Sequence, residues 1–263
     1  MRAIGLCLHD VLDVEQVSPG DVYALRLPGF KSHLRAIAEQ KPTIRTIHTR
    51  CDWGTEVPVF ITFDDGTAGA YAFGGALLEP HSWRGHFFVT TDWIGRAGYM
   101  DRNQIRDLHN RGHIIGSHSC SHPERMSRLT TSELIREWKD SCAILGDIVG
   151  LPVKVASVAG GYYSRKVAEA AASVGIQVLF TSEPISTTEL VDGCLVLGRY
   201  TVQSFTPPAV TGAIAAGRRW PRWKQRALWD AKRILKAVGG ESYVTLRREL
   251  LSRLMSRQET ARQ

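Results

Sequence analysis

The chain has 263 residues, 43% of them hydrophobic and 22% charged, which allows one α/β domain with a full buried core and excludes extended disorder. Its net charge of +7 is uneven, because the segment from Arg218 onward carries 13 Lys and Arg against 4 Asp and Glu, whereas the first 217 residues carry 20 against 22. The near-neutral main part argues against a nucleic-acid enzyme with a basic face. The chain contains no run of about 18 uncharged apolar residues, so no membrane-spanning helix is expected.

Short apolar runs alternate with helical patterns along the chain. They are too continuous in Val, Ile, Leu and Phe for strands with one solvent-facing side, so we expect burial on both faces. The seven predicted strands, in chain order, are Ala3–Leu8, Val57–Phe63, His86–Val89, His113–Ser117, Val155–Val158, Ile176–Phe180 and Leu195–Arg199. The first run meets His9 and Asp10 too early for a secretory apolar stretch, so a strand is expected there and not a signal peptide. Strands that alternate with helices indicate a parallel sheet, either open or closed into a barrel.

The helices between these strands have recognisable ends. Asp101 is expected to cap one helix, and Ser164 another. Thr130 and Glu133 have the spacing of a capping box, and Gly150 follows the last apolar residue of that helix. These signals predict where three of the helices begin or end.

Four of the predicted strands lead into polar or Gly-rich segments. These segments are His9–Asp10, Asp64–Gly66, His118–His122 and Gly160–Tyr163. Because the carboxyl ends of parallel strands meet at one edge of a sheet or one rim of a barrel, we expect the four segments to lie close together.

Two of these segments carry residue types that suit metal-assisted hydrolysis. Asp64 and Asp65 can divide two roles, in which one binds a metal ion and the other takes a proton from water, or they can form an ordinary Asp-Asp-Gly turn. His118 and His122, four residues apart, can reach one divalent ion from the same side of a turn, or they can be an unrelated pair. With Asp65 they give two nitrogens and one oxygen, which leaves positions open as in catalytic zinc sites. Cys120 is expected to point away and pack.

The sequences ITFDDG at 61–66 and HSCSH at 118–122 resemble the first two motifs of the polysaccharide deacetylases, carbohydrate esterase family four with the NodB-homology domain. The resemblance runs from about residue 9 to 199 and implies an α/β fold, a distorted (β/α) barrel of about seven parallel strands. It implies that Asp64 is the general base and that Asp65, His118 and His122 hold one divalent metal ion of the zinc or cobalt type. It also implies an N-acetylated saccharide as substrate and the backbone N–H of Tyr162 as the donor to the oxyanion.

The chain departs from this family in two places. The family's third motif carries an Arg and a Pro before a Gly-aromatic turn, but residues 156–163 (ASVAGGYY) have neither, so the group that holds the base is unassigned. Arg199 is a candidate, unless it only forms a surface salt bridge. The late Leu-x-Ile-His motif, which supplies the general acid, is missing, and no His follows His122. The chain resembles a branch with an N-terminal His-Asp strand end, so His9 is the candidate acid, unless it only caps a strand.

The predicted function is that of a metal-dependent hydrolase, which removes N-acetyl groups from an N-acetylated sugar in a glycan or lipid-linked saccharide. The alternatives are a non-catalytic carbohydrate-binding relative and another metal-dependent amidohydrolase. The intact acidic and histidine motifs favour the enzyme, because a pure binder needs neither a base nor a metal site. The five cysteines are odd in number and lack CxxC pairs, which indicates reduced thiols and a cytoplasmic protein.

We divide the chain into a domain of residues 1–205 and a basic, Trp-rich helical tail of residues 206–263. From Arg222 to Val238, apolar residues recur on one helical stripe with basic residues around it. This helix would either pack on the domain or lie at the inner face of an anionic membrane and bring the enzyme to a lipid-linked sugar. Nucleic-acid binding is not expected, because no reading module accompanies the tail.

Overall fold

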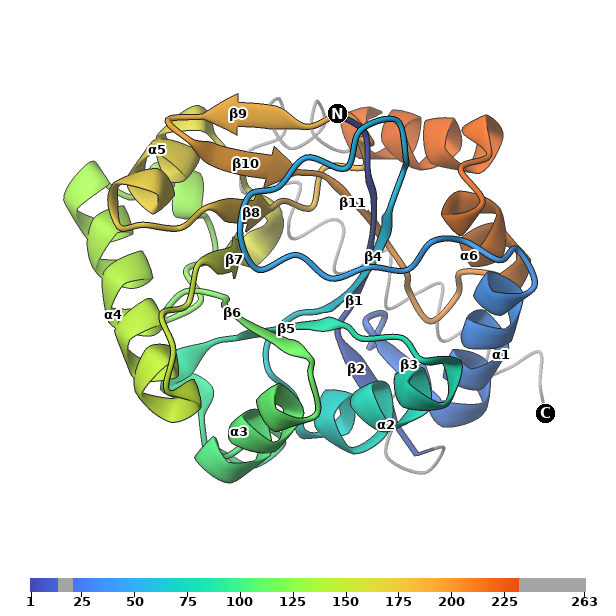
Figure 1. Ribbon diagram of the computed structural model, residues 1–263, viewed down its shortest axis with the longest axis horizontal. Helices are drawn as coiled ribbons and strands as arrows, with labels where there is room; N and C mark the ends of the chain where they lie inside the picture. The colour runs from blue at the N-terminus through green and yellow to red at the C-terminus, as the bar shows by residue number, and fades with distance from the viewer. Residues whose placement is uncertain (14–20, 232–263) are drawn as a thin grey trace, which may run out of the picture.

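A computed structural model describes residues 1–13 and 21–231 (Figure 1). Its main sheet has nine strands in the order β11-β1-β4-β5-β6-β7-β8-β10-β9, and all neighbouring pairs are parallel except β10 with β9. These strands are β1 (Ile4–Leu8), β4 (Val59–Phe63), β5 (His86–Val89), β6 (Ile114–Ser117), β7 (Val155–Ser157), β8 (Val178–Phe180), β9 (Glu189–Val191), β10 (Cys194–Leu197) and β11 (Arg199–Thr201). A separate parallel pair is formed by β2 (Asp10–Leu12) and β3 (Ala24–Arg26).

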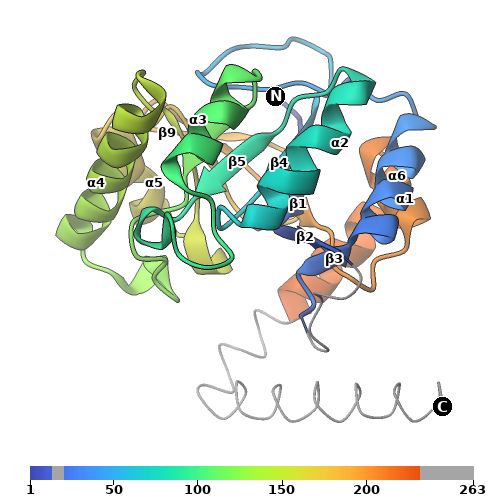
Figure 2. The same ribbon diagram turned by 90° about the horizontal axis from the view of Figure 1, so that it is seen from below.

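The helices surround the strands, with α1 beside α6 and α4 beside α5 (Figures 1 and 2). They are α1 (Leu27–Ala38), α2 (Ala76–Leu78), α3 (Arg102–Asn110), α4 (Thr131–Val149), α5 (Arg165–Ser173) and α6 (Pro208–Ala215). The predicted cap at Asp101 of α3 and the predicted capping box at Thr130 of α4 are confirmed, and Gly150 ends α4 in the left-handed conformation. Asp101 also forms a capping box, with Gln104, which was not predicted. Ser164 is the N-cap residue of α5, but its side chain makes no capping hydrogen bond.

The sheet curls until its two ends nearly meet. The strand β11 pairs with β1 at one end, and β10 lies next to the other end, yet only Gly198 separates β10 from β11 in the chain. Gly198 is needed because a Cβ there would lie 2.4 Å from the Glu183 carbonyl oxygen. The expected mostly parallel α/β architecture is therefore confirmed, with eight parallel strands and the antiparallel β9 instead of about seven strands.

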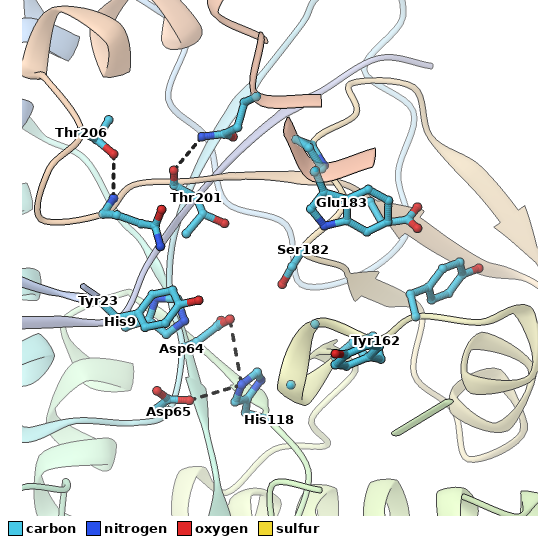
Figure 3. A pocket seen from close by; sticks show the side chains of 18 of the residues that line it. His9, Tyr23, Asp64, Asp65, His118, Tyr162, Ser182, Glu183, Thr201 and Thr206 are labelled. Atoms are coloured by element: carbon cyan, nitrogen blue, oxygen red, sulfur yellow. Dashed lines mark hydrogen bonds and ion pairs between the residues drawn. The ribbon is translucent and has the colours of Figure 1, made fainter. Parts of the chain in front are cut away.

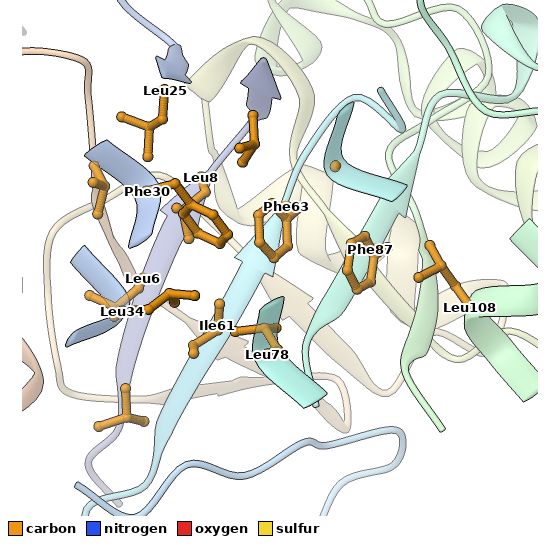
Figure 4. Packing of buried hydrophobic residues seen from close by; sticks show 14 of the residues in the cluster. Leu6, Leu8, Leu25, Phe30, Leu34, Ile61, Phe63, Leu78, Phe87 and Leu108 are labelled. Carbon is orange, nitrogen blue, oxygen red and sulfur yellow. The ribbon is translucent and has the colours of Figure 1, made fainter. Parts of the chain in front are cut away.

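The sheet is buried on both faces, as the continuous apolar runs predict. On the outer face, Ile61 and Phe63 pack with Phe30 of α1, Leu78 of α2 and the residues around them (Figure 4). The inner face carries a second cluster of alternate residues, which comprises Phe60, Phe88, Phe180, Leu195 and Leu197 among others. Because side chains alternate across a strand, the residues that follow β4 continue this pattern into the space above the inner cluster.

The structure changes the expected element list in a limited way. All seven predicted strands are present, but Leu195–Arg199 is divided at Gly198, so that Arg199 begins β11. The strands β2, β3, β9 and β11 were not predicted, because three residues are too few to show a period of two. No helix within the described ranges is long and apolar enough to cross a membrane.

The described part of the tail packs against the rest of the chain. Gly212 lets α6 approach α1 closely, because a Cβ there would lie 2.4 Å from the Ala36 carbonyl oxygen. A further helix begins at residue 219 and is described to 231, and Gln225 Nε2 donates to the Thr201 carbonyl at 2.8 Å. The remainder of the stripe predicted to reach Val238 lies outside the described residues.

Candidate active site

A pocket of about 630 Å³ lies at the carboxyl ends of the strands (Figure 3). Its volume falls in the range of small-molecule binding sites. The four predicted strand-end segments all contribute to its lining, through His9, Asp64, Asp65, His118, His122, Gly160, Gly161, Tyr162 and Tyr163. The predicted convergence of these segments is therefore confirmed.

Asp65, His118 and His122 form a cluster in the lining of this pocket. The Asp65 Oδ1 atom lies 3.4 Å from His118 Nε2 and 3.4 Å from His122 Nε2. One atom of each residue lies within 4.8 Å of the others, as a shared metal ion requires. Ligands about 2.0–2.1 Å from a tetrahedral zinc ion are separated by roughly 3.3 Å, so the observed spacing needs little rearrangement.

The surrounding structure restrains the side chains of this cluster. His118 Nδ1 lies 3.0 Å from the Ser157 carbonyl oxygen, so Nδ1 carries the proton and donates it there, which leaves Nε2 with its lone pair toward the cluster. The His122 ring stacks on Trp93, with 4.9 Å between ring centroids. Asp65 and His122 both have positive φ angles, 72° and 55°, which are uncommon for residues other than Gly and occur often at functional sites, although Asp and His adopt them more readily than most residues.

Asp64 lies beside this cluster and is held by Arg199. The guanidinium donates two hydrogen bonds to the carboxylate, from Nη1 to Oδ1 at 2.6 Å and from Nη2 to Oδ2 at 2.7 Å. It also donates to Ser157 Oγ and to the Thr181 carbonyl, and it lies over the Phe88 ring. Arg199 is 0% exposed and Asp64 is 2% exposed, so the alternative of a surface salt bridge for Arg199 is wrong.

Gly5 on β1 makes room for this arginine. A Cβ at Gly5 would lie 2.5 Å from Arg199 Cγ and 2.8 Å from the Gly198 carbonyl oxygen. The close pairing of β1 with β11 therefore depends on a residue without a side chain. This pairing brings the Arg199 guanidinium into contact with Asp64.

The charges of the site favour a bound cation. Burial alone raises the pKa of Asp64, but Arg199 and His118 more than offset it and hold that pKa at about 2. Burial also raises the pKa of Asp65, yet the neighbouring imidazoles of His118 and His122 bring it well below its usual range. Burial lowers the pKa of His118, and the two carboxylates reverse this effect, so that its pKa is raised. Carboxylates that attract a proton to His118 would attract a divalent cation to the same place.

His9 lies on the other side of Asp64. One atom each of Cys7, His9 and Asp64 lies within 4.8 Å of the others, and the His9 ring packs against Tyr23 at 4.5 Å between centroids. His9 Nδ1 is buried and has no hydrogen-bond partner within residues 1–13 and 21–231. Burial lowers the pKa of His9, and the nearby carboxylates reverse this only in part. Because Arg199 occupies both oxygens of Asp64, a cation fits the Asp65 cluster better than this one.

The other predicted residues have the following places. Tyr162 lines the pocket, with Arg125 over its ring, and its oxyanion role stays a prediction. Cys120 packs against Thr91, whose Oγ1 lies 3.1 Å from its Sγ, and it does not belong to the metal-ligand cluster. Asp10 accepts hydrogen bonds from Thr67 Oγ1 and the Val11 backbone N–H, which keeps it out of the pocket lining.

Several residues of the site were not found from the sequence. Glu137 on α4 accepts from the backbone N–H groups of Cys120 and Ser121, at 2.8 and 2.9 Å, and so anchors the loop between the two histidines. The loop after β8 lines the pocket with Ser182 and Glu183. These contacts join segments that are distant in the sequence and follow no fixed spacing, so no local pattern could reveal them.

Comparison with known proteins gives consistent matches. The model of the family described as "Polysaccharide deacetylase" matches residues 54–179. The peptidoglycan-N-acetylmuramic acid deacetylase PdaA of Bacillus subtilis is 33% identical over 88 residues, which cover 33% of this chain and 31% of PdaA. The chain spans less than half the length of the first curated relatives that it matches.

Solved structures show the same fold. The deacetylase PplD of Streptococcus pyogenes, solved with acetate, has a TM-score of 0.65 and 17% identity over 79% of this chain and 95% of that one. A polysaccharide deacetylase from Bacillus cereus has a TM-score of 0.68 and 20% identity over 81% of this chain and 69% of that one.

Proposed function

Since the chain belongs to the polysaccharide deacetylase family, we propose that it is a metal-dependent hydrolase that removes N-acetyl groups from an N-acetylated saccharide. The observation that carries this proposal is that two aspartates in one pocket have different partners. Asp65 shares a cluster with two histidines, while Asp64 is held apart from it by a buried arginine. A non-catalytic saccharide binder would need neither arrangement.

The residues of the cluster fit a zinc-type ion. They offer two imidazole nitrogens and one carboxylate oxygen, and an orienting hydrogen bond at His118 leaves its Nε2 available. When bound, the ion would supply a Lewis acid that polarises the acetyl carbonyl and lowers the pKa of a water molecule. The identity of the ion as zinc is part of the proposal.

The proposed roles of the protein groups follow from their places. Asp64 is ionised, and it takes a proton from the attacking water as general base. Arg199 keeps the carboxylate fixed while this proton is transferred. The backbone N–H of Tyr162 donates to the developing oxyanion. When the bond between the acetyl carbon and the sugar nitrogen breaks, the amine that remains on the sugar needs a proton, which His9 passes on after receiving it from Asp64.

Acetate release tests this function directly. The zinc-loaded protein should release acetate from an N-acetylglucosamine oligosaccharide, lose this activity on chelation and regain it when zinc is added back. Acetate release that persists in full after chelation would contradict metal dependence. Release from O-acetylated sugars without any release from N-acetylated ones would make the protein an esterase.

The metal site gives a separate prediction. His118→Ala should reduce bound zinc from about one ion per chain to a small fraction, because it removes a ligand whose orientation the Ser157 carbonyl fixes. Elemental analysis of the purified proteins measures this, with His109→Ala on α3 as a histidine control outside the pocket. Equal zinc content in wild type and His118→Ala would refute the ligand assignment.

The role of His9 gives a second prediction. His9→Ala should lower turnover of an N-acetylated saccharide by about 10²-fold or more, because general acid catalysis contributes on this scale. The loss on an aryl acetate should be much smaller, since a phenolate departs without a proton, and zinc content should stay the same. Equal losses on both substrates would show that His9 supports the structure or positions the substrate.

The proposal also covers the cellular location of the protein and the glycan or lipid to which its saccharide substrate is attached. All five cysteines are free in the structure, as expected for reduced thiols. We propose a cytoplasmic enzyme acting on a glycan or lipid-linked saccharide, and contact between its tail and an anionic membrane stays a prediction. The two exposed tryptophans that would make this contact, Trp220 and Trp223, stack on each other at 5.3 Å.

A further inference from the structure

One wall of the pocket comes from the helix at residues 219–231. This helix supplies Gln225, Leu228 and Trp229 to the lining, and it lies beyond the residues that match the family model. The three positions have the spacing of one helical face. The hydrogen bond from Gln225 Nε2 to the Thr201 carbonyl ties this face to the residues that end β11.

The wall combines an aromatic ring with an unsatisfied polar atom. Trp229 is half-buried, and the Arg226 guanidinium lies over its ring at 5.3 Å. Arg226 is itself held by Asp230, whose Oδ2 accepts from its Nε at 2.8 Å, so the indole is oriented before any ligand binds. Gln225 Oε1 is buried and has no hydrogen-bond partner in the part of the chain that the structure describes. A buried acceptor of this kind is unfavourable until a donor reaches it.

We propose that Trp229 and Gln225 form a saccharide-binding subsite for a sugar ring that adjoins the ring carrying the acetyl group. A pyranose ring has an apolar face of C–H groups, which suits the indole, and a rim of hydroxyl groups, one of which would donate to Gln225 Oε1. The choice of a sugar rests on the proposed function, whereas the placement of the wall rests on the structure.

The remaining lining favours a sugar over a lipid chain. Ser182, Glu183, Gln203 and Thr206 also line the pocket, and their polar groups interrupt any continuous apolar surface. An acyl chain would desolvate these polar groups, whereas sugar hydroxyls can form hydrogen bonds with them. Leu228, which is 53% exposed, gives only a small apolar contact at the edge of the wall.

Binding of a saccharide that cannot be deacetylated tests the subsite. The probe is a glucosamine tetrasaccharide, which carries no acetyl group, titrated calorimetrically into the zinc-loaded full chain. Trp229→Ala should raise Kd about tenfold, and Trp229→Leu should do nearly the same because it has no ring face. Trp229→Phe should retain most of the affinity. Trp223→Ala, on the same helix and 61% exposed, is the matched control and should change Kd by less than about twofold.

The outcomes separate the subsite from the proposed activity. If Trp229→Ala and Trp229→Leu bind the tetrasaccharide as wild type does, or if wild type does not bind it, the subsite is refuted. Thermal melting of each variant shows whether it is folded, and Trp229→Leu carries the test should Trp229→Ala fail to fold. If the variants lose binding as expected but wild type releases no acetate from an N-acetylated oligosaccharide, the subsite stands and the proposed deacetylase function fails.

Discussion

Replacing Asp64 with Asn is expected to lower turnover of an N-acetylated saccharide by about 10²–10⁴-fold, because the amide cannot accept the proton of the attacking water. Zinc should stay bound, since Asp64 lies outside the Asp65 cluster. Rates and zinc content are measured on the same preparation. A variant with near-normal turnover would remove Asp64 from the role of base.

The same substitution should also destabilise the fold. It leaves the Arg199 guanidinium buried without its counterion, and breaking a buried pair in this way costs about 3–5 kcal/mol. Rates therefore have to be compared at a temperature where urea unfolding shows the variant to be native. Asp10→Asn is a suitable control, because Asp10 accepts hydrogen bonds nearby but does not line the pocket.

Arg199→Met should have the second large effect. It removes both hydrogen bonds that fix Asp64 and leaves a buried carboxylate, so the free energy of unfolding should fall by about 3–5 kcal/mol. Turnover should fall more than tenfold, because the base loses its fixed orientation. Arg199→Lys should keep the charge but lose the two-point contact, and it should lie between the wild type and Arg199→Met in both measurements.

A double variant measures directly how strongly Asp64 and Arg199 are coupled. Asp64→Asn combined with Arg199→Met removes both charges, so it should be less destabilised than the sum of the two single variants by more than about 1 kcal/mol. Strict additivity of the three unfolding free energies would show that the buried pair does not couple the two residues.

The sequence predicts those parts of the structure that depend on local signals. The four predicted strands that lead into the pocket segments are apolar runs, and the cap at Asp101 and the capping box at Thr130 mark helices where they occur. The convergence of Asp64, Asp65, His118 and His122 follows from the shared edge of parallel strands. Their roles as base and ligands stay predictions that the experiments above test.

The rest depends on contacts between distant segments. Arg199 lies 135 residues from Asp64 in the chain, and the sequence offers only its position near a strand end to suggest the contact. The wall made by Gln225 and Trp229 depends on how the helix at 219–231 packs, and its amphipathic pattern alone is compatible with a protein or a membrane surface. Three-residue strands such as β11 carry too few residues for any periodicity.

The junction at Gly198 has a consequence for the order in which the site is completed. Synthesis from the N-terminus releases the segments with Asp65, His118 and His122 well before Arg199 leaves the ribosome. Until then Asp64 has no counterion and stays hydrated, because burying an unpaired carboxylate is unfavourable. Pairing of β11 with β1 adds the last parallel strand to the sheet and at the same time brings the Arg199 charge to Asp64. The residues proposed to bind the metal ion are thus synthesised before the arginine that holds the proposed base.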